Sequence, residues 1–177
     1  MRLSGFIIGG AFLLALPFAH AAGKMSSEDE ATLKKLAQGD LAEIAGGKMA
    51  QERATSPEVK KFAAQMAKDH GRMLDEKKRM AKAKGVALPT QADGEQQAEA
   101  QKLQSMAKQD FDREYMGHMV KDHTDDLELI KKTAQDAKDP QLKAAAGKAE
   151  PIISKHLEMA KSIQAGLGSG STGASSH

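Results

Sequence analysis

Three long stretches of the sequence place apolar residues at alternating intervals of four and three, the spacing that lines one face of an α-helix. Each stretch also carries a histidine at one of these apolar positions, namely His70, His123 or His156. Two of the histidines end a repeated motif, because Met66-Ala-Lys-Asp-His70 returns 53 residues later as Met119-Val-Lys-Asp-His123. The pattern predicts packed helices that each point one histidine into a shared core.

Start and stop signals divide the chain into four long helices. Ser27 and Glu30 have the spacing of a capping box, and Ser56-Pro57-Glu58 and Asp139-Pro140 each place a capping residue before a proline suited to a first helical turn. Gly85 is expected to end the second helix. The expected ranges are 28–53, 57–84, 110–137 and 140–163, with a weaker helix over 95–107.

The fold class follows from these helices and from a composition rich in alanine, lysine, glutamate, glutamine and methionine, which are strong helix formers. Short turns pair the first helix with the second and the third with the fourth, and the connector over 85–109 is long enough to cross between the two pairs. We therefore expect an all-α, antiparallel four-helix bundle over 22–166. Residues 167–177 read as a disordered Gly/Ser-rich tail.

The N-terminus has the features of a cleavable signal peptide over 1–21. Arg2 precedes an apolar run over 6–18, and Ala19-His20-Ala21 forms a small-x-small cleavage signal. The run is too short for a membrane-spanning helix, and the mature chain carries no other candidate span. We expect export to the bacterial periplasm. The sequence contains no cysteine, so disulfides and thiolate chemistry are both excluded.

Charge and aromatic content argue against a nucleic-acid partner. Cleavage of 21 residues from 177 leaves a mature chain of 156, and loss of Arg2 leaves 25 basic against 24 acidic side chains. Phosphate binding needs a clustered basic face, whereas the two signs are mixed here. Tyr115, Phe62 and Phe111 are the only aromatic residues of the mature chain, which is too few for base stacking.

The three histidines are expected at one depth in the bundle. His70 lies about 15 residues from the first turn, and His123 and His156 lie about 15 and 17 residues from the second, so each is roughly 23 to 26 Å from a helix end. Each helix is roughly 40 Å long, which places all three near its middle. Glu43, on the edge of the first apolar stripe, lies at roughly 18 Å and could join them.

The chain closely resembles a bacterial family, domain of unknown function 4142. The resemblance rests on matching segments along almost the whole mature chain: Gln38-Gly-Asp-Leu-Ala-Glu-Ile44, Arg53-Ala-Thr-Ser-Pro-Glu-Val-Lys-Lys-Phe-Ala63, Asp69-His70, Gly85-Val-Ala-Leu-Pro89, Phe111-Asp-Arg113, Met119-Val-Lys-Asp-His123, Asp139-Pro140 and His156-Leu157. It implies an exported protein with a ferritin-like four-helix fold and no established activity. Ala45 departs from the family pattern, in which a second glutamate often follows the residue matching Glu43.

A di-iron site is improbable for this chain. Ferritin-like di-iron proteins take one glutamate from each of two helices and a Glu-x-x-His motif from each of the other two. The sequence contains no Glu-x-x-His, because methionine, alanine, valine or isoleucine occupies the positions three and four residues before each of the three histidines. A single zinc or copper ion held by His70, His123 and His156, with Glu43 as a fourth ligand, suits the residue types better.

Residues near the three histidines could add hydrogen bonds to the imidazoles or further metal ligands. Asp69 and Asp122 precede their histidines and could hydrogen-bond imidazoles of adjacent helices. Met66 and Met119 precede them by one turn and could offer soft thioethers to Cu(I), although methionine is more often a core filler.

Three functions remain open at this point. The first is a non-enzymatic exported protein that binds a metal ion through the mid-bundle histidines. The second is a structural or interaction module of the cell envelope, with an envelope protein as its partner and histidines that only organise the core. A redox metalloenzyme comes third. The residues do not predict the oligomeric state.

Overall fold

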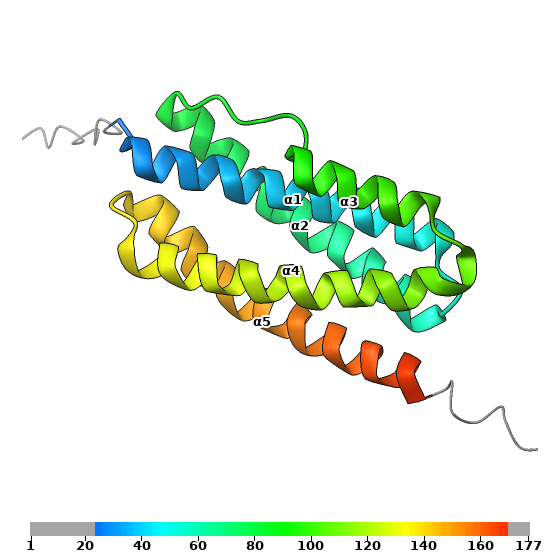
Figure 1. Cartoon of the computed structure of the whole chain (residues 1–177). Helices are drawn as coiled ribbons and strands as arrows, with labels where there is room; N and C mark the ends of the chain where they lie inside the picture. Colours follow the sequence, from blue (N-terminus) through cyan, green and yellow to red (C-terminus); the bar gives the residue numbers. More distant parts are fainter. Residues whose placement is uncertain (1–23, 170–177) are drawn as a thin grey trace, which may run out of the picture.

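The computed structural model describes residues 24–169, and within that range its regular secondary structure is entirely helical. The helices in chain order are α1 (Ser27–Arg53), α2 (Pro57–Lys84), α3 (Gly94–Ser105), α4 (Lys108–Asp136) and α5 (Pro140–Ser169) (Figure 1). The predicted all-α class is confirmed. The predicted signal peptide over 1–21 and residues 170–177 of the predicted tail lie outside the described range.

The four long helices form two hairpins, α1 with α2 and α4 with α5 (Figure 1). The two hairpin turns lie at opposite ends of the molecule, and the connector with α3 runs back along α1 to the start of α4. Gly47 lets α1 approach α2 closely, because a Cβ at this position would stand 2.7 Å from the carbonyl oxygen of Ala63.

Most helix ends follow the expected signals. Ser56 caps α2, and Gly85 ends it with φ of 69°, in the left-handed region that favours glycine. Asp93 and Gln96 form a full capping box at α3. The prediction for α1 was one residue off, because the Oγ of Ser26, rather than that of Ser27, accepts from the N–H of Asp29.

Each hairpin turn is held by a carboxylate of the opposite hairpin. Asp112 of α4 accepts hydrogen bonds from the backbone N–H groups of Thr55 and Ser56 and from the Thr55 hydroxyl. At the other end, Asp29 of α1 accepts from the backbone N–H groups of Lys138 and Asp139. Both carboxylates are buried, and their hydrogen bonds fix the orientation of one hairpin relative to the other.

Replacement of Asp112 by alanine is expected to destabilise the protein by about 2 to 4 kcal/mol, since it leaves several buried donors without an acceptor. Chemical denaturation measures this change. The matched control is Asp110→Ala two residues earlier, where the carboxylate is half-exposed and pairs with Arg113. The control is expected to change stability by less than about 0.5 kcal/mol. Equal losses of stability in the two variants would show that the hydrogen bonds of Asp112 to the α1–α2 turn do not stabilise the protein.

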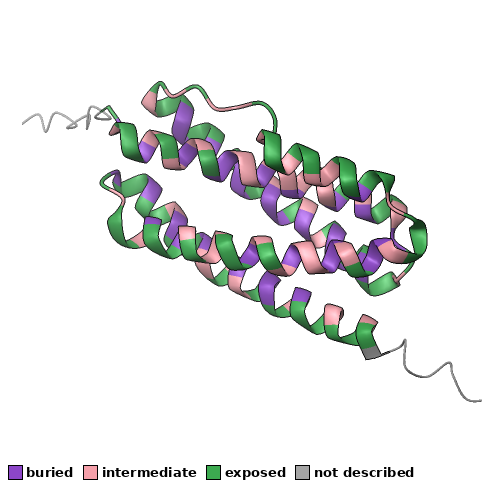
Figure 2. Ribbon diagram, viewed as in Figure 1, coloured by how far each residue is buried: buried purple, intermediate pink, exposed green. Residues whose placement is uncertain are grey.

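The core consists of two apolar clusters separated by a polar layer. The first cluster lies towards the α1–α2 turn and includes Phe62, Phe111 and Tyr115. The second lies towards the α4–α5 turn and includes Leu33 and Ile153. Between them, every long helix contributes buried polar residues, here called the central polar layer: Asp40, Glu43, Asp69, His70, His123 and His156. Figure 2 shows that buried positions follow the inward faces of the helices.

Helix α5 differs from its prediction in two respects. Leu142, Ala149 and His156 of the predicted stripe are buried, but Ile152 and Met159 are only half-buried, and Ile153 and Ala160 are buried in their place. The buried face is therefore turned by about half a residue, or roughly 50°, from the predicted one. His156 is buried in both registers. The helix also continues to Ser169, past the predicted end at Ile163, so residues 167–169 of the predicted tail are helical.

None of the helices in residues 24–169 combines the length and the apolar character needed to cross a membrane.

Candidate metal centre

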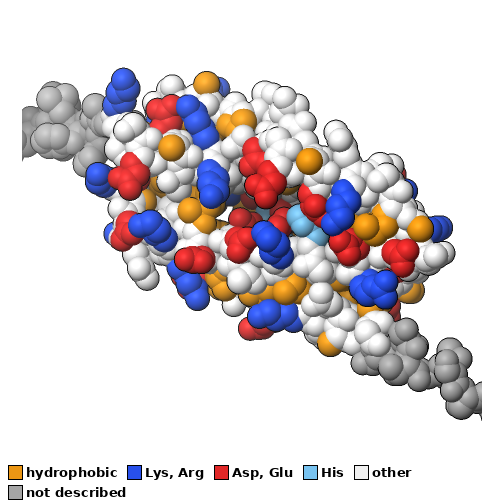
Figure 3. All heavy atoms as spheres, in the orientation of Figure 1, with side chains coloured by type: hydrophobic (Ala, Val, Ile, Leu, Met, Phe, Trp, Pro, Cys, Tyr) orange, Lys and Arg blue, Asp and Glu red, His pale blue; other side chains and the backbone are white. Residues whose placement is uncertain are grey.

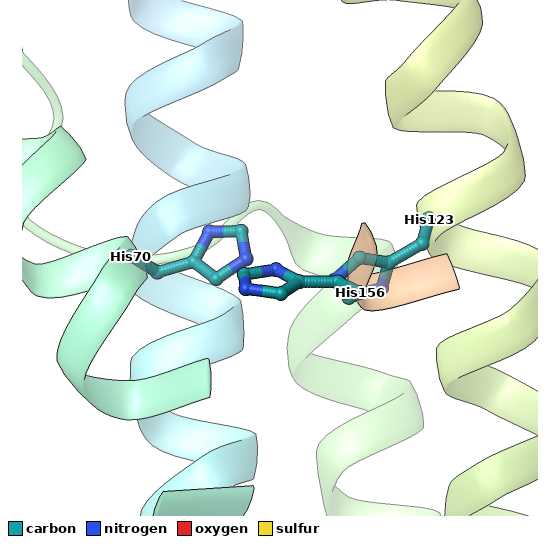
Figure 4. Close-up of side chains that lie close together, drawn as sticks. All are labelled: His70, His123 and His156. Carbon is teal, nitrogen blue, oxygen red and sulfur yellow. The ribbon is translucent and has the colours of Figure 1, made fainter. Parts of the chain in front are cut away.

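Three imidazoles from three helices meet in the central polar layer. His70 comes from α2, His123 from α4 and His156 from α5, and none of them is more than 2% exposed. One ring nitrogen of each lies within 4.8 Å of one ring nitrogen of each of the others. Figure 4 shows the three rings converging between the helices. The three histidines therefore form a buried triad that could hold a metal ion, at the common depth predicted from the sequence.

Each imidazole of the triad is oriented through one of its two nitrogens. His70 Nδ1 lies 3.0 Å from Asp40 Oδ1, and His156 Nε2 lies 3.0 Å from Asp69 Oδ2. His123 Nδ1 lies 3.0 Å from the carbonyl oxygen of Met119, which can only accept, so this nitrogen carries the proton. In a neutral ring the proton on the first nitrogen leaves a lone pair on the second.

The second nitrogen of each imidazole has no hydrogen-bond partner among the described residues: His70 Nε2, His123 Nε2 and His156 Nδ1. A buried acceptor without a partner costs about 1 to 3 kcal/mol, so three of them in one layer call for a common explanation. A histidine metal ligand has the same two-sided arrangement, with one nitrogen on the ion and the other on a carboxylate or carbonyl. The triad shares this two-sided arrangement of its ring nitrogens.

The two carboxylates that orient the triad are themselves fixed. Asp40 Oδ2 accepts from Lys77 Nζ at 2.6 Å. Asp69 accepts from Gln65 at 2.5 Å and also pairs with Arg72. Burial alone would raise the pKa of Asp69, but hydrogen bonds from Gln65, the triad imidazole and Arg72 hold it below its usual range. The ionised carboxylate is a strong acceptor for a histidine N–H, which makes the opposite nitrogen more basic.

Two imidazoles of the triad, His123 and His156, are electrically neutral at physiological pH. Burial lowers the pKa of His123 from 6.5 to about 3, and the two neighbouring imidazoles lower it further. Burial also lowers the pKa of His156, partly offset by its hydrogen bond to Asp69. Because a metal binds the deprotonated nitrogen, these shifts leave the lone pairs free.

Glu43 lies beside the triad rather than within it. Its Oε1 is 3.8 Å from His123 Nδ1, the nitrogen that already bonds to the Met119 carbonyl. Its Oε2 has no partner among the described residues. Burial and then the charges of Asp126, Asp122 and Asp40 raise the pKa of Glu43 well above its ordinary value. Direct ligation by Glu43 would require its side chain to turn towards the free nitrogens.

The other predicted site residues have different surroundings. Asp122 is half-buried and pairs with His118 of its own helix at 3.0 Å, so it does not orient a triad imidazole. Met66 and Met119 pack in the first apolar cluster. Met119 contributes to the site through its carbonyl oxygen.

Sequence reasoning missed Asp40 and Asp126. Asp40 holds His70, and it could have been found because it precedes Glu43 by three residues and therefore shares its helix face. Asp126 follows His123 by the same interval. Burial raises its pKa to about 6, with the charges of Asp122 and Asp40 adding to the shift and those of His70 and Lys77 opposing it.

Comparison with known protein families matches residues 15–163 to the family described as Domain of unknown function (DUF4142). The chain belongs to the DUF4142 family. The resemblance found in the sequence is thus confirmed, and the DUF4142 match includes all three triad histidines. Searches among curated proteins and among solved structures found no match. Membership in DUF4142 assigns no activity, so the function must be argued from the site.

Proposed function

We propose that the protein binds a single transition-metal ion through His70, His123 and His156. The proposal rests on the hydrogen bonding of each imidazole. One ring nitrogen is bonded to the protein, and the other is buried without a partner. Three such free nitrogens from three helices supply most of the ligand set of a tetrahedral ion.

The donor set favours zinc or copper, because both ions prefer imidazole nitrogen to carboxylate oxygen. Metal–nitrogen bonds of about 2.0 to 2.1 Å would place the ligand nitrogens roughly 3.3 to 3.6 Å apart. The nitrogens now lie within 4.8 Å of one another, so binding is accompanied by a small inward movement of the rings. Participation of the Met66 or Met119 sulfur would shift the preference to Cu(I).

Three protein ligands leave one coordination position for water, a small molecule or a reoriented Glu43. We propose a binding role rather than catalysis of the di-iron type. The sequence supports this choice, because no Glu-x-x-His motif occurs and apolar residues stand one turn before each histidine.

Export to the periplasm and a ferritin-like bundle complete the proposal. Arg2, the apolar run over 6–18 and Ala19-His20-Ala21 support a cleaved signal peptide. Two antiparallel hairpins joined by a long connector support the ferritin-like arrangement, in which metal sites lie in the core between facing helices.

A second candidate is an envelope module that interacts with another protein and whose histidines only organise the core. It is favoured by the position of the central polar layer between two apolar clusters, since buried polar groups can set helix register. This function requires no ion at the triad.

Metal content separates the two candidates. Protein purified from the periplasm of its native host, and the same protein reloaded with zinc or copper and desalted, is expected to contain about one ion per chain by elemental analysis. The His70→Ala, His123→Ala, His156→Ala triple variant is expected to contain less than about one tenth of that amount. A metal content that does not differ between the two proteins would exclude the triad as the site.

A further inference from the structure

A cleft between α1 and α4, partly roofed by α3, leads towards the central polar layer. Its volume is about 490 Å³, and its lining includes Glu43, Asp122 and Asp126. Figure 3 shows acidic side chains gathered around a hollow in the middle of this face. Gly39 also lines the cleft, where a Cβ would approach the Asp126 carboxylate no closer than 4.0 Å, so its missing side chain keeps the passage wide.

The cleft carries a marked excess of negative charge. Eight carboxylates and three lysines line it, which leaves five negative charges when all are ionised. Two of the lysines are engaged by outer carboxylates, Lys102 by Glu114 at 2.8 Å and Lys121 by Asp125 at 2.9 Å. Among the described residues, no lysine or arginine pairs with Glu43 or Asp126. The carboxyl groups without a basic partner therefore lie at the inner part of the cleft.

Glu43 connects the cleft with the triad. Its side chain is 4% exposed and its Oε2 has no partner, although it lines an acidic cleft. Its other oxygen lies 3.8 Å from the His123 ring. A buried carboxyl group without a donor, surrounded by further carboxylates, is satisfied by its own proton or by a cation that displaces this proton, and here the next ligand atoms inward are the triad imidazole nitrogens.

We propose that this acidic cleft is the access route of the metal ion and that Glu43 transfers the ion from the cleft to the triad. The inference rests on the proposed function. The cleft attracts a hydrated divalent cation, Asp122 and Asp126 replace part of its hydration, and Glu43 hands it to the free imidazole nitrogens. Clefts lined by one sign of charge raise association rates by about 10- to 1000-fold.

The opposite face of the molecule is less suitable for a cation. A pocket of about 430 Å³ between α2 and α5 also reaches His156 and Asp69. Three cationic side chains line it, Lys61, Arg72 and Lys155, and only Arg72 is paired with the one carboxylate of the lining, Asp69, so a net positive charge remains. This pocket repels a divalent ion and would instead admit an anion or a neutral molecule to the open coordination position.

Stopped-flow measurement of zinc association with the metal-free full chain tests the route. In the double variant Asp122→Asn, Asp126→Asn the association rate at low ionic strength is expected to fall by about 10-fold or more, and salt is expected to reduce the difference. Glu43→Gln is expected to slow association as well. The matched control is Asp75→Asn on the outer face of α2, where the side chain is 64% exposed, and its rate is expected to stay within about 2-fold of the wild type.

A steric variant keeps the charges and narrows the passage. Gly39→Leu places an apolar side chain beside Asp126 and is expected to slow association at low and at high salt alike. Equilibrium zinc content and circular dichroism are measured for each variant to establish folding and an intact triad.

The outcomes separate this inference from the proposed function. Wild-type association rates in the double variant and in Gly39→Leu, with zinc still bound at equilibrium, would overturn the access route and leave the metal site standing. Faster association in Lys61→Glu, Lys155→Glu with no effect of the cleft variants would assign access to the α2/α5 pocket instead. No zinc bound to the wild-type protein would remove both proposals.

Discussion

Zinc at about 1000 times its dissociation constant is expected to stabilise the protein by about 4 kcal/mol. For a chain of this size the gain corresponds to a rise of about 8 to 16 °C in melting temperature. The physical reason is that the folded state alone brings the three imidazoles together, so the free energy of binding adds to that of folding. Differential scanning calorimetry of the metal-free protein with and without zinc measures the shift.

The same zinc-induced shift is measured in the triple alanine variant of the triad. Structural zinc in small domains is worth about 10 to 16 kcal/mol over four ligands, or roughly 3 kcal/mol for each, so even a single loss weakens binding by about 100-fold or more. The triple variant is expected to show a shift below about 2 °C. His118→Ala, which removes a histidine outside the triad, is expected to retain the full shift.

A zinc-induced shift of equal size in the wild type and in the triple variant would place the binding elsewhere on the surface. The absence of any shift, with zinc or with copper, would favour the envelope module whose histidines only organise the core.

Replacement of His123 by leucine is expected to stabilise the metal-free protein by about 1 to 3 kcal/mol while it abolishes tight metal binding. The substitution removes a buried nitrogen that has no partner and supplies an apolar side chain of similar size. His123 is the best choice among the three, because its hydrogen bond goes to a backbone carbonyl rather than to a carboxylate. Urea denaturation in the presence of a chelator measures the difference.

The stability gained by His123→Leu relative to the wild type is expected to grow as the pH falls. In the folded protein the pKa of His123 is about 3, against an ordinary 6.5, so below pH 6.5 only the unfolded chain takes up this proton. The wild type therefore loses up to about 1.4 kcal/mol per pH unit from this group between pH 6 and pH 3, and the variant does not. Glu43, His70 and His156 face the same position in both proteins, so the difference between the two profiles isolates His123.

Destabilisation by 2 kcal/mol or more in His123→Leu at neutral pH would have the opposite meaning. It would show that the imidazole stabilises the core without an ion, as the envelope-module candidate requires. The corresponding change at His70 or His156 is less informative, because it deprives Asp40 or Asp69 of a partner.

The sequence predicted the helices well because their signals are local. Ser56-Pro57 and Asp139-Pro140 begin α2 and α5, and Gly85 ends α2. The prediction was less accurate where two adjacent serines could each cap a helix, since Ser26 rather than Ser27 caps α1. It also failed at the end of α5, where a Gly/Ser-rich composition suggested an end at Ile163 and the helix continues to Ser169.

The sequence predicted that the three histidines meet, and it predicted their surroundings only in part. A depth of 15 to 17 residues from a turn is a property of the helix rise, which explains why the triad histidines meet at one level. Asp40 was missed because hydrogen bonding between α1 and α2 depends on how the two helices rotate about their axes. Even a rotation of about half a residue, as found in α5, changes which neighbours a side chain meets.

The sequence alone determined that the chain is helical and that three histidines point inward at one depth, because period, rise and capping are properties of each helix by itself. Its matching segments determined that it belongs with DUF4142 proteins. The tertiary structure decided which nitrogen of each imidazole is bonded and which is free. It also decided that Glu43 lies beside the triad, at the floor of an acidic cleft. These features depend on partners from other helices, whose positions no local pattern specifies.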